Sequence, residues 1–214
     1  MPLDTYLKLH KGLPSDMPTM VDIFLDAFSA NTIGRTFFPR HALSTQYFWI
    51  KTLSEEIHDP NAHFLIVSDA SARPVAFAKW VAPLPRGTLV PPMPAESEWP
   101  VDGDPKLAAV FFQKLANMHD DIMVDRPHWY LEIMVTRGAD QGRGAGGLMM
   151  AWGVKKADED GVEAYLDATP EGKPLYEKFG FQNVVTWPFF DDTYRHSFML
   201  RNPMEPGGKR GSAV

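Results

Sequence analysis

The chain of 214 residues contains no cysteine. This absence excludes disulfide bonds, zinc sites with cysteine ligands and cysteine nucleophiles, and it is compatible with a reducing compartment. Long apolar runs are absent too. No stretch approaches the roughly 20 apolar residues of a membrane-spanning helix, and the charged first residues do not resemble a signal peptide. We therefore expect no membrane partner and a cytoplasmic location, with the nucleus as the alternative.

Basic residues are in deficit, with 21 Lys and Arg against 27 Asp and Glu, which gives a formal net charge of −6. Nucleic-acid binding depends mostly on Lys and Arg contacts to phosphates, so we expect no nucleic-acid partner. The acidic balance fits a cationic small substrate, such as an amine, better. The 7 histidines show no spacing typical of metal ligands, so we expect no metal.

The chain has the size of one domain, which we expect to span residues 1–204, with a disordered tail at 205–214. A proline-rich loop followed by a helix, at 83–128, has the character of an insertion. Residues 32–40 are expected to be irregular. Apolar and turn patterns predict helices at 14–28, 44–57, 106–118, 144–160 and 172–179, and strands at 6–10, 62–68, 74–82, 129–136, 162–166, 182–187 and 195–201.

Helical spacing also predicts which side chains face the core. Ile50 is expected to point inward from the helix at 44–57, and Leu107 and Val110 from the helix at 106–118. His119 is expected at a solvated helix end.

The most informative segment is the glycine-rich turn at 141–147, which reads Gln-Gly-Arg-Gly-Ala-Gly-Gly between a strand and a helix. Such a turn directs backbone N–H groups and the positive end of the helix dipole at one point, which favours a phosphate or pyrophosphate. No Gly-Lys-Ser/Thr follows, so the turn is not a P-loop. An ordinary glycine-rich loop is the structural alternative.

Three of the glycines, Gly142, Gly144 and Gly147, spell the dinucleotide fingerprint G-x-G-x-x-G, with Asp167 about 20 residues later. Two observations oppose this interpretation. Residues 137–141 separate the strand from the first glycine, whereas the fingerprint begins at the strand end. Only 67 residues follow Gly147, too few for the further βαβ units of a doubly wound sheet.

The same turn also contains Q-x-x-G-x-G, at Gln141, Gly144 and Gly146, and residues 175–181 read Leu-Tyr-Glu-Lys-Phe-Gly-Phe. Together with the strands at 130–136 and 164–168, these motifs resemble the GNAT family of N-acetyltransferases over most of the chain. The segments 125–128, 152–153 and 157–161 are similar to a fungal subgroup of that family.

This resemblance implies an α/β (α+β) fold with a mixed, mostly antiparallel sheet of six to seven strands, flanked by helices, whose central parallel strands splay apart. It implies an acyltransferase that moves an acetyl group from acetyl-coenzyme A to a primary amine by direct attack in a ternary complex. The acceptor would be a small-molecule or peptide amine, and the protein a monomer or homodimer. Alternatives are another acyl donor, a hydroxyl acceptor, or a coenzyme A-binding regulatory domain without turnover.

The resemblance also implies a donor site. Backbone groups of the fourth strand would meet the pantetheine arm, and the turn would hold the pyrophosphate. Thr169 stands where many relatives have asparagine. The residues that the resemblance assigns to the donor are Met134, Val135, Thr136, Gln141, Gly142, Arg143, Gly144, Ala145, Gly146, Thr169 and Tyr176.

Two side chains are candidates for proton transfer. Tyr176 stands where the family has a general acid for the departing thiolate, although an aromatic residue here also suits a core. Glu132 lies in an otherwise apolar strand, and burial of a lone carboxylate is costly. We expect it to be a buried general base, acting directly or through a water; an ion pair or an exposed edge position is the alternative.

The acceptor side is less defined by the sequence. His128 is a candidate for the acceptor cleft, and the aromatic residues Phe37 and Phe38 are equally suited to its wall or to the core. Trp99, in the proline-rich loop, is a candidate for the wall or for a surface cap.

Overall fold

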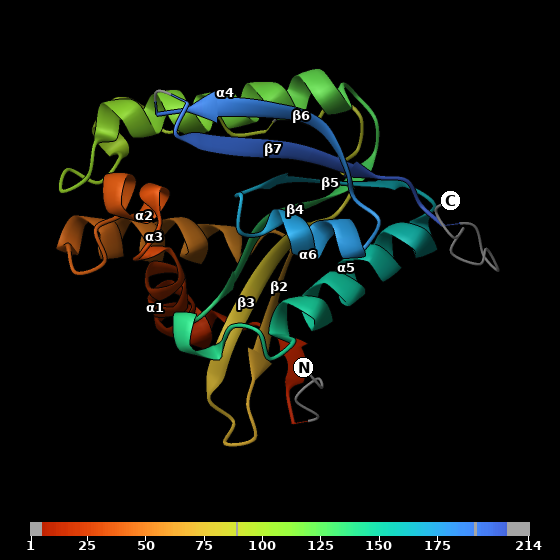
Figure 1. Cartoon of the computed structure of the whole chain (residues 1–214), viewed down its shortest axis with the longest axis horizontal. Helices are drawn as coiled ribbons and strands as arrows, with labels where there is room; N and C mark the ends of the chain where they lie inside the picture. The colour runs from red at the N-terminus through yellow and green to blue at the C-terminus, as the bar shows by residue number, and fades with distance from the viewer. Residues whose placement is uncertain (1–5, 89, 191, 205–214) are drawn as a thin grey trace.

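The computed structural model describes residues 6–88, 90–190 and 192–204, and within them the chain forms one seven-stranded mixed sheet (Figure 1). The tail expected at 205–214 lies outside the described residues. In spatial order the strands are β1 (Lys8–Lys11), β2 (Ala62–Ser68), β3 (Pro74–Val81), β4 (His128–Thr136), β5 (Glu163–Ala168), β7 (Tyr194–Arg201) and β6 (Gln182–Phe189). Only the β4–β5 pair is parallel among these strands, which agrees with the expected mixed, mostly antiparallel sheet.

Helices cover both faces of this sheet. Helices α5 (Ala145–Asp160) and α6 (Lys173–Lys178) lie on one face, in front of the sheet in Figure 1. The other face carries α1 (Met17–Phe28), α2 (Thr32–Phe37), α3 (Leu43–Glu56) and α4 (Pro105–Met123). Helix α4 lies along β6 and β7, and the Asp104 side chain caps its start by accepting a hydrogen bond from Leu107 N at 2.9 Å.

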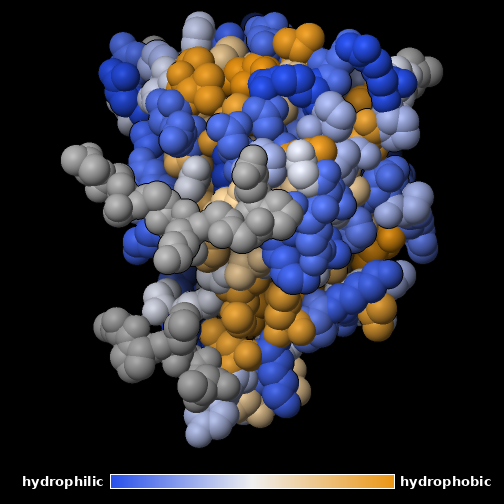
Figure 2. Space-filling view, turned by 90° about the vertical axis from the view of Figure 1, so that its right-hand side faces the viewer, coloured by the Kyte–Doolittle hydropathy of each residue, from blue (hydrophilic) through white to orange (hydrophobic). Residues whose placement is uncertain are grey.

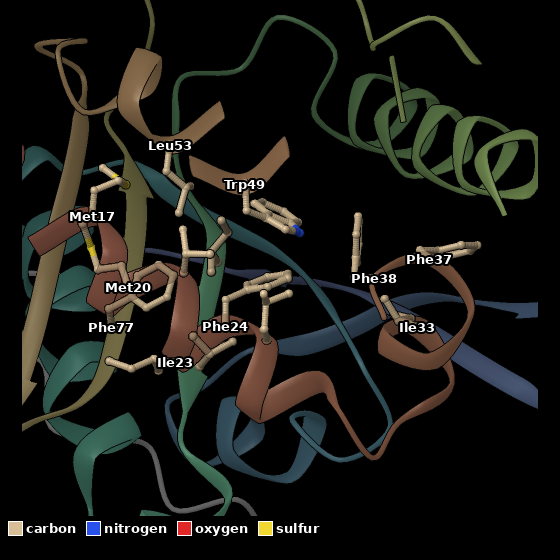
Figure 3. Close-up of a cluster of buried hydrophobic side chains, with 14 of the residues drawn as sticks. Met17, Met20, Ile23, Phe24, Ile33, Phe37, Phe38, Trp49, Leu53 and Phe77 are labelled. Atoms are coloured by element: carbon tan, nitrogen blue, oxygen red, sulfur yellow. The ribbon is translucent and has the colours of Figure 1, made fainter. Parts of the chain in front are cut away.

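An aromatic core fills the space between the sheet and helices α1 to α4. Figure 3 shows its side chains pointing toward one another from α1, α2, α3 and β3. Residues 32–37 form α2 rather than an irregular segment, because the Asn31 side chain caps the first turn and accepts a hydrogen bond from Gly34 N at 2.9 Å. Phe37 and Phe38 belong to this core, and so does Trp99, which is buried and stacks on Phe112.

The sequence predicted the positions of the helices better than the faces that they turn toward the core. Ile50 is exposed, because Trp49 and Leu53 are the residues that α3 turns toward the core. Helix α4 runs five residues beyond its expected end. Its face is rotated as well, so Leu107 and Val110 point to solvent while Ala108 and Phe111 are buried.

A β-bulge divides β4 into two halves that face opposite layers. Leu131 pairs with Trp80 and Ile133 pairs with Lys79, which leaves Glu132 without a partner on β3. The extra residue reverses the alternation of side chains along the strand. Leu131 therefore packs in the cluster beneath α5, whereas Ile133 packs in the aromatic core.

The surface in Figure 2 is mostly hydrophilic, and the hydrophobic residues on that face gather in separate groups. Across the residues that the structure describes, no helix combines the length and apolar character needed to cross a bilayer.

Helix α5 approaches the sheet closely at Gly153, which lies against the ring of Trp80. A Cβ at Gly153 would lie 2.1 Å from Trp80 Cε2, and the indole is held because its Nε1 donates to Met149 O at 3.3 Å. The contact therefore requires glycine at this position.

We predict that Gly153→Ala lowers the free energy of unfolding by about 1–3 kcal/mol, because the methyl group overpacks a fully buried site. Urea denaturation measures this change. The control is Gly147→Ala in the same helix, where no atom lies within 4 Å of the new Cβ and stability should be unchanged or higher. Equal stability of the two variants would contradict the prediction.

Candidate active site

The site begins where the two parallel strands separate. Strands β4 and β5 pair over four positions, from His128–Glu163 to Leu131–Leu166, and the pairing ends immediately before Glu132. Beyond this point β5 continues beside β7, and β4 continues beside β3. The expected splay is therefore present. It leaves the β5-facing edge of residues 134–136 without a strand partner among the described residues.

The glycine turn lies at the end of this open edge. Gly142 has φ +77° and Gly144 has φ +105°, in the left-handed region that favours glycine. Gly144 is the N-cap of α5 and supplies no side-chain cap. Among the described residues, the N–H groups of Ala145 and Gly146 have no acceptor, as is usual for the first N–H groups of a helix. Such a helix start fits an anion.

One side chain connects the turn to β4. Gln141 Nε2 donates a hydrogen bond to Thr136 O at 3.3 Å, which holds the turn beside the last residue of the strand. The amide of Gln141 thus donates to the backbone carbonyl without adding charge beside the turn.

A cleft of about 2570 Å³ runs along the open edge and reaches residues of α1, α3 and α4. It brings together all the predicted donor and proton-transfer residues except Arg143. The residues concerned are Glu132, Met134, Val135, Thr136, Gln141, Gly142, Gly144, Ala145, Gly146, Thr169 and Tyr176.

Tyr176 reaches the cleft from α6, on the β5 side. Its side chain is largely buried, and a Cβ at Gly172 would lie 3.2 Å from its hydroxyl. Thr169 helps to position this helix by accepting a hydrogen bond from Gly172 N at 3.2 Å. Burial, and then the charge of Asp167, raise the pKa of the Tyr176 phenol well above its ordinary value. The phenol therefore stays protonated near neutral pH and is able to donate a proton.

Glu132 is not the buried lone carboxylate that the strand pattern suggested. Its side chain is 31% exposed, because the bulge turns it into the cleft, and its Oε2 lies 2.6 Å from Lys79 Nζ. The ion pair is the alternative that the sequence left open. Lys79 itself is buried and pairs also with Glu56 Oε2, at 2.8 Å. Neither Lys79 nor Glu56 was predicted as a site residue.

Comparison with known proteins identifies the family. The sequence profile described as the acetyltransferase (GNAT) family matches residues 18–181. The chain belongs to the GNAT family of acetyltransferases. Acyl transfer is therefore the reaction class of this GNAT protein. A search of functionally curated proteins found no sequence that matches the chain.

Solved structures share the fold at low sequence identity. The chain is similar to the structure of the histone acetyltransferase HPA2 and related acetyltransferase from Corynebacterium glutamicum, with 19% identity, a TM-score of 0.65 and coverage of 95% of this chain and 100% of that one. It also resembles an N-acetyltransferase from Staphylococcus aureus Mu50 (14%, TM-score 0.55, coverage 92% and 99%). A third is the ribosomal-protein-S18-alanine N-acetyltransferase from Escherichia coli (13%, TM-score 0.55, coverage 95% and 97%).

A polar network that the sequence analysis missed lies in the GNAT cleft, where side chains of β4, β5, β7 and α4 meet. Asp167 accepts a hydrogen bond from the Tyr130 hydroxyl at 2.9 Å and lies 3.0 Å from His196 Nε2. His119 is not at a solvated helix end: it stacks on Tyr165, and burial lowers its pKa to about 4. The Nε2 atoms of His119 and His128 are 2.6 Å apart, which places the predicted cleft residue His128 at the cleft wall.

The Arg143 side chain has a structural contact instead of lining the cleft. Its Nη1 lies 2.7 Å from Asp140 Oδ1, and Arg73, in the β2–β3 hairpin, donates to both oxygens of the same carboxylate, at 3.0 and 2.8 Å. These hydrogen bonds, that of Arg73 foremost, lower the pKa of Asp140. Asp140 therefore joins the glycine turn to the hairpin.

We predict that Asp140→Asn lowers the thermal midpoint at pH 7 by about 2–4 °C, because two arginines lose their shared carboxylate. A group with a lowered pKa stabilises the fold above its ordinary pKa. The difference between the variant and the wild type should therefore shrink as the pH falls below 3.8. Thermal unfolding followed across pH measures both effects.

The control is Asp125→Asn, which removes an exposed ion pair with Arg86 of the kind that adds little stability. A midpoint difference for Asp140→Asn that persists unchanged at low pH would exclude the ionised carboxylate as its cause.

Proposed function

We propose that the protein is an N-acetyltransferase that moves the acetyl group of acetyl-coenzyme A to a primary amine, by direct attack in a ternary complex. The observation that carries the proposal is the uncapped start of α5, which opens beside the unpaired edge of β4 at the point where β4 and β5 separate. An anion-binding helix start and a strand edge with free backbone groups suit a donor that carries a pyrophosphate and a pantetheine amide chain.

The chain has groups for each proton transfer of the reaction. Tyr176 keeps its phenolic proton and lines the same cleft, which supports its role as the acid that protonates the leaving thiolate. Carboxylates on the acceptor side of the cleft, of which the sequence pointed to Glu132, are suited to remove a proton from the acceptor ammonium. The chain has no cysteine, and direct attack by the amine needs none.

Thiol release with a panel of primary amines and of acyl-coenzyme A donors tests this function. The expected result is turnover with acetyl-coenzyme A and amines. Calorimetry that detects no binding of acetyl-coenzyme A would refute the proposal. Binding without turnover would favour a regulatory domain, and turnover only with longer donors or with hydroxyl acceptors would favour another acyltransferase.

We predict that Gly144→Asp abolishes donor binding by calorimetry. The new carboxylate would lie at the N-terminus of α5, where it would fill the approach to the free N–H groups and repel the pyrophosphate. The matched control is Gly161→Asp, at the C-terminal end of the same helix. Gly161 also has a left-handed φ, of +66°, so the control adds the same charge at another left-handed position. Donor binding retained by Gly144→Asp would show that the pyrophosphate lies elsewhere.

We predict that Tyr176→Phe lowers kcat about 100-fold and changes donor affinity little, because the hydroxyl acts on the leaving group. Steady-state kinetics and calorimetry separate the two effects. The control is Tyr165→Phe. The buried Tyr165 hydroxyl has no hydrogen-bond partner among the described residues and does not line the cleft, so its removal should leave kcat unchanged. Unchanged turnover of Tyr176→Phe would remove the acid role.

A further inference from the structure

Two carboxylates and one ammonium form a compact cluster on the acceptor side of the cleft. Lys79, on β3, is 6% exposed and lies between Glu56, the last residue of α3, and Glu132, in the bulge of β4. Its Nζ is 2.8 Å from Glu56 Oε2 and 2.6 Å from Glu132 Oε2. Three separate elements thus converge on one charged group, and both carboxylates line the cleft.

The cluster has one negative charge more than its cation neutralises. A structural ion pair would need only one acid for the buried lysine, whereas here two acids share it. Glu56 Oε2 is buried and, among the described residues, has no well-aligned hydrogen bond, so the ion pair with Lys79 is its main compensation. Such a carboxylate is the group in the cluster that gains most by binding a proton.

We propose that Glu56 is the general base of the reaction and that Lys79 and Glu132 set its proton affinity. The proposal rests on the proposed function and deepens it, since it names the group that receives the proton of the acceptor ammonium. It also favours acceptors that arrive as cations, because the net negative cluster attracts an ammonium and offers nothing comparable to a neutral hydroxyl.

The charges around Glu56 agree with this assignment. The ionisable groups that face it are Lys79 from β3, Glu132 from β4 and Glu55 from its own helix. Burial and the neighbouring charge of Glu132 raise the pKa of Glu56 to about 7, while Lys79 acts in the opposite direction. Glu56 is therefore ionised above about pH 7 and protonated below it, which suits a base that works near neutral pH.

The proton balance of the reaction is complete with these residues. Glu56 takes one proton from the acceptor ammonium, which leaves a neutral amine. The amine nitrogen attacks the thioester carbonyl carbon, the C–S bond breaks, and the thiolate takes a proton from the Tyr176 hydroxyl. The second amine proton, released as the amide forms, restores the phenol through solvent, and Glu56 later returns its proton to solvent.

The dependence of kcat/KM on pH tests the proposal. We expect the kcat/KM of the wild type to increase as the pH rises through about 7. This rising limb of the pH profile reports the ionisation of Glu56. Glu56→Gln should lower kcat about 100-fold and remove the limb. The control is Glu55→Gln, which deletes the same charge from the neighbouring exposed residue. It should retain the limb, moved slightly to lower pH, because Glu55 is the weakest of the charges that act on Glu56.

Two further variants separate Glu56 from Glu132 as the base. Glu132→Gln removes a negative neighbour, so the limb should persist and move to lower pH. Lys79→Met removes the cation, so the limb should move to higher pH. Opposite shifts support the proposal. Loss of all activity in Glu132→Gln, together with a wild-type profile in Glu56→Gln, would overturn it and assign the base to Glu132.

A measurement without turnover keeps the test independent of the proposed function. Carbon NMR of the glutamate carboxyls in the protein without donor should show one carboxyl that titrates near pH 7, absent in Glu56→Gln and present in Glu55→Gln. A titration that survives in Glu56→Gln would refute the assignment. Absence of thiol release by the wild type, with this titration present, would instead count against the proposed function alone.

Discussion

The separation of β4 from β5 is the constraint on which the rest of the site depends. The two strands pair for four positions, and the bulge at Glu132 then turns β4 away. The same extra residue reverses the faces of the strand, so that its second half joins the aromatic core and Glu132 meets Lys79. The strand edge opens and a carboxylate enters the cleft at this one inserted residue, so both halves of the proposed reaction would meet at the same point of the sheet.

The two sides of the cleft are built by different means. The donor side uses backbone groups: an unpaired strand edge and the first turn of a helix whose cap has no side chain. Such groups recognise a large, constant molecule and tolerate variation in the side chains around them. The proposed acceptor side uses side chains: the buried Trp99 of the proline-rich loop, and the cluster that Lys79 of β3 forms with Glu56 of α3 and Glu132 of β4.

The sequence predicted the parts of the site that are local. The glycine turn and the segment at 175–181 carry their geometry in consecutive residues, so their fold and the residues lining the cleft could be named in advance. The bulge at Glu132 could not, because nothing in an apolar strand marks which residue lacks a partner. Lys79 and Glu56 are 23 positions apart in the chain, and only the packing of α3 on the sheet brings them together. The sequence did offer one signal for this cluster, because Lys79 is the single charged residue in the apolar strand at 74–81.

The carboxylate of Asp140 gives the β2–β3 hairpin a part in the site that its position in the sequence conceals. Hairpin loops are usually the places where homologous proteins gain and lose residues. Here the loop carries Arg73, whose guanidinium reaches across to the segment that precedes the glycine turn. A longer or shorter loop would move the arginine and release the turn, so the length of this distant hairpin is under the same constraint as the donor site itself.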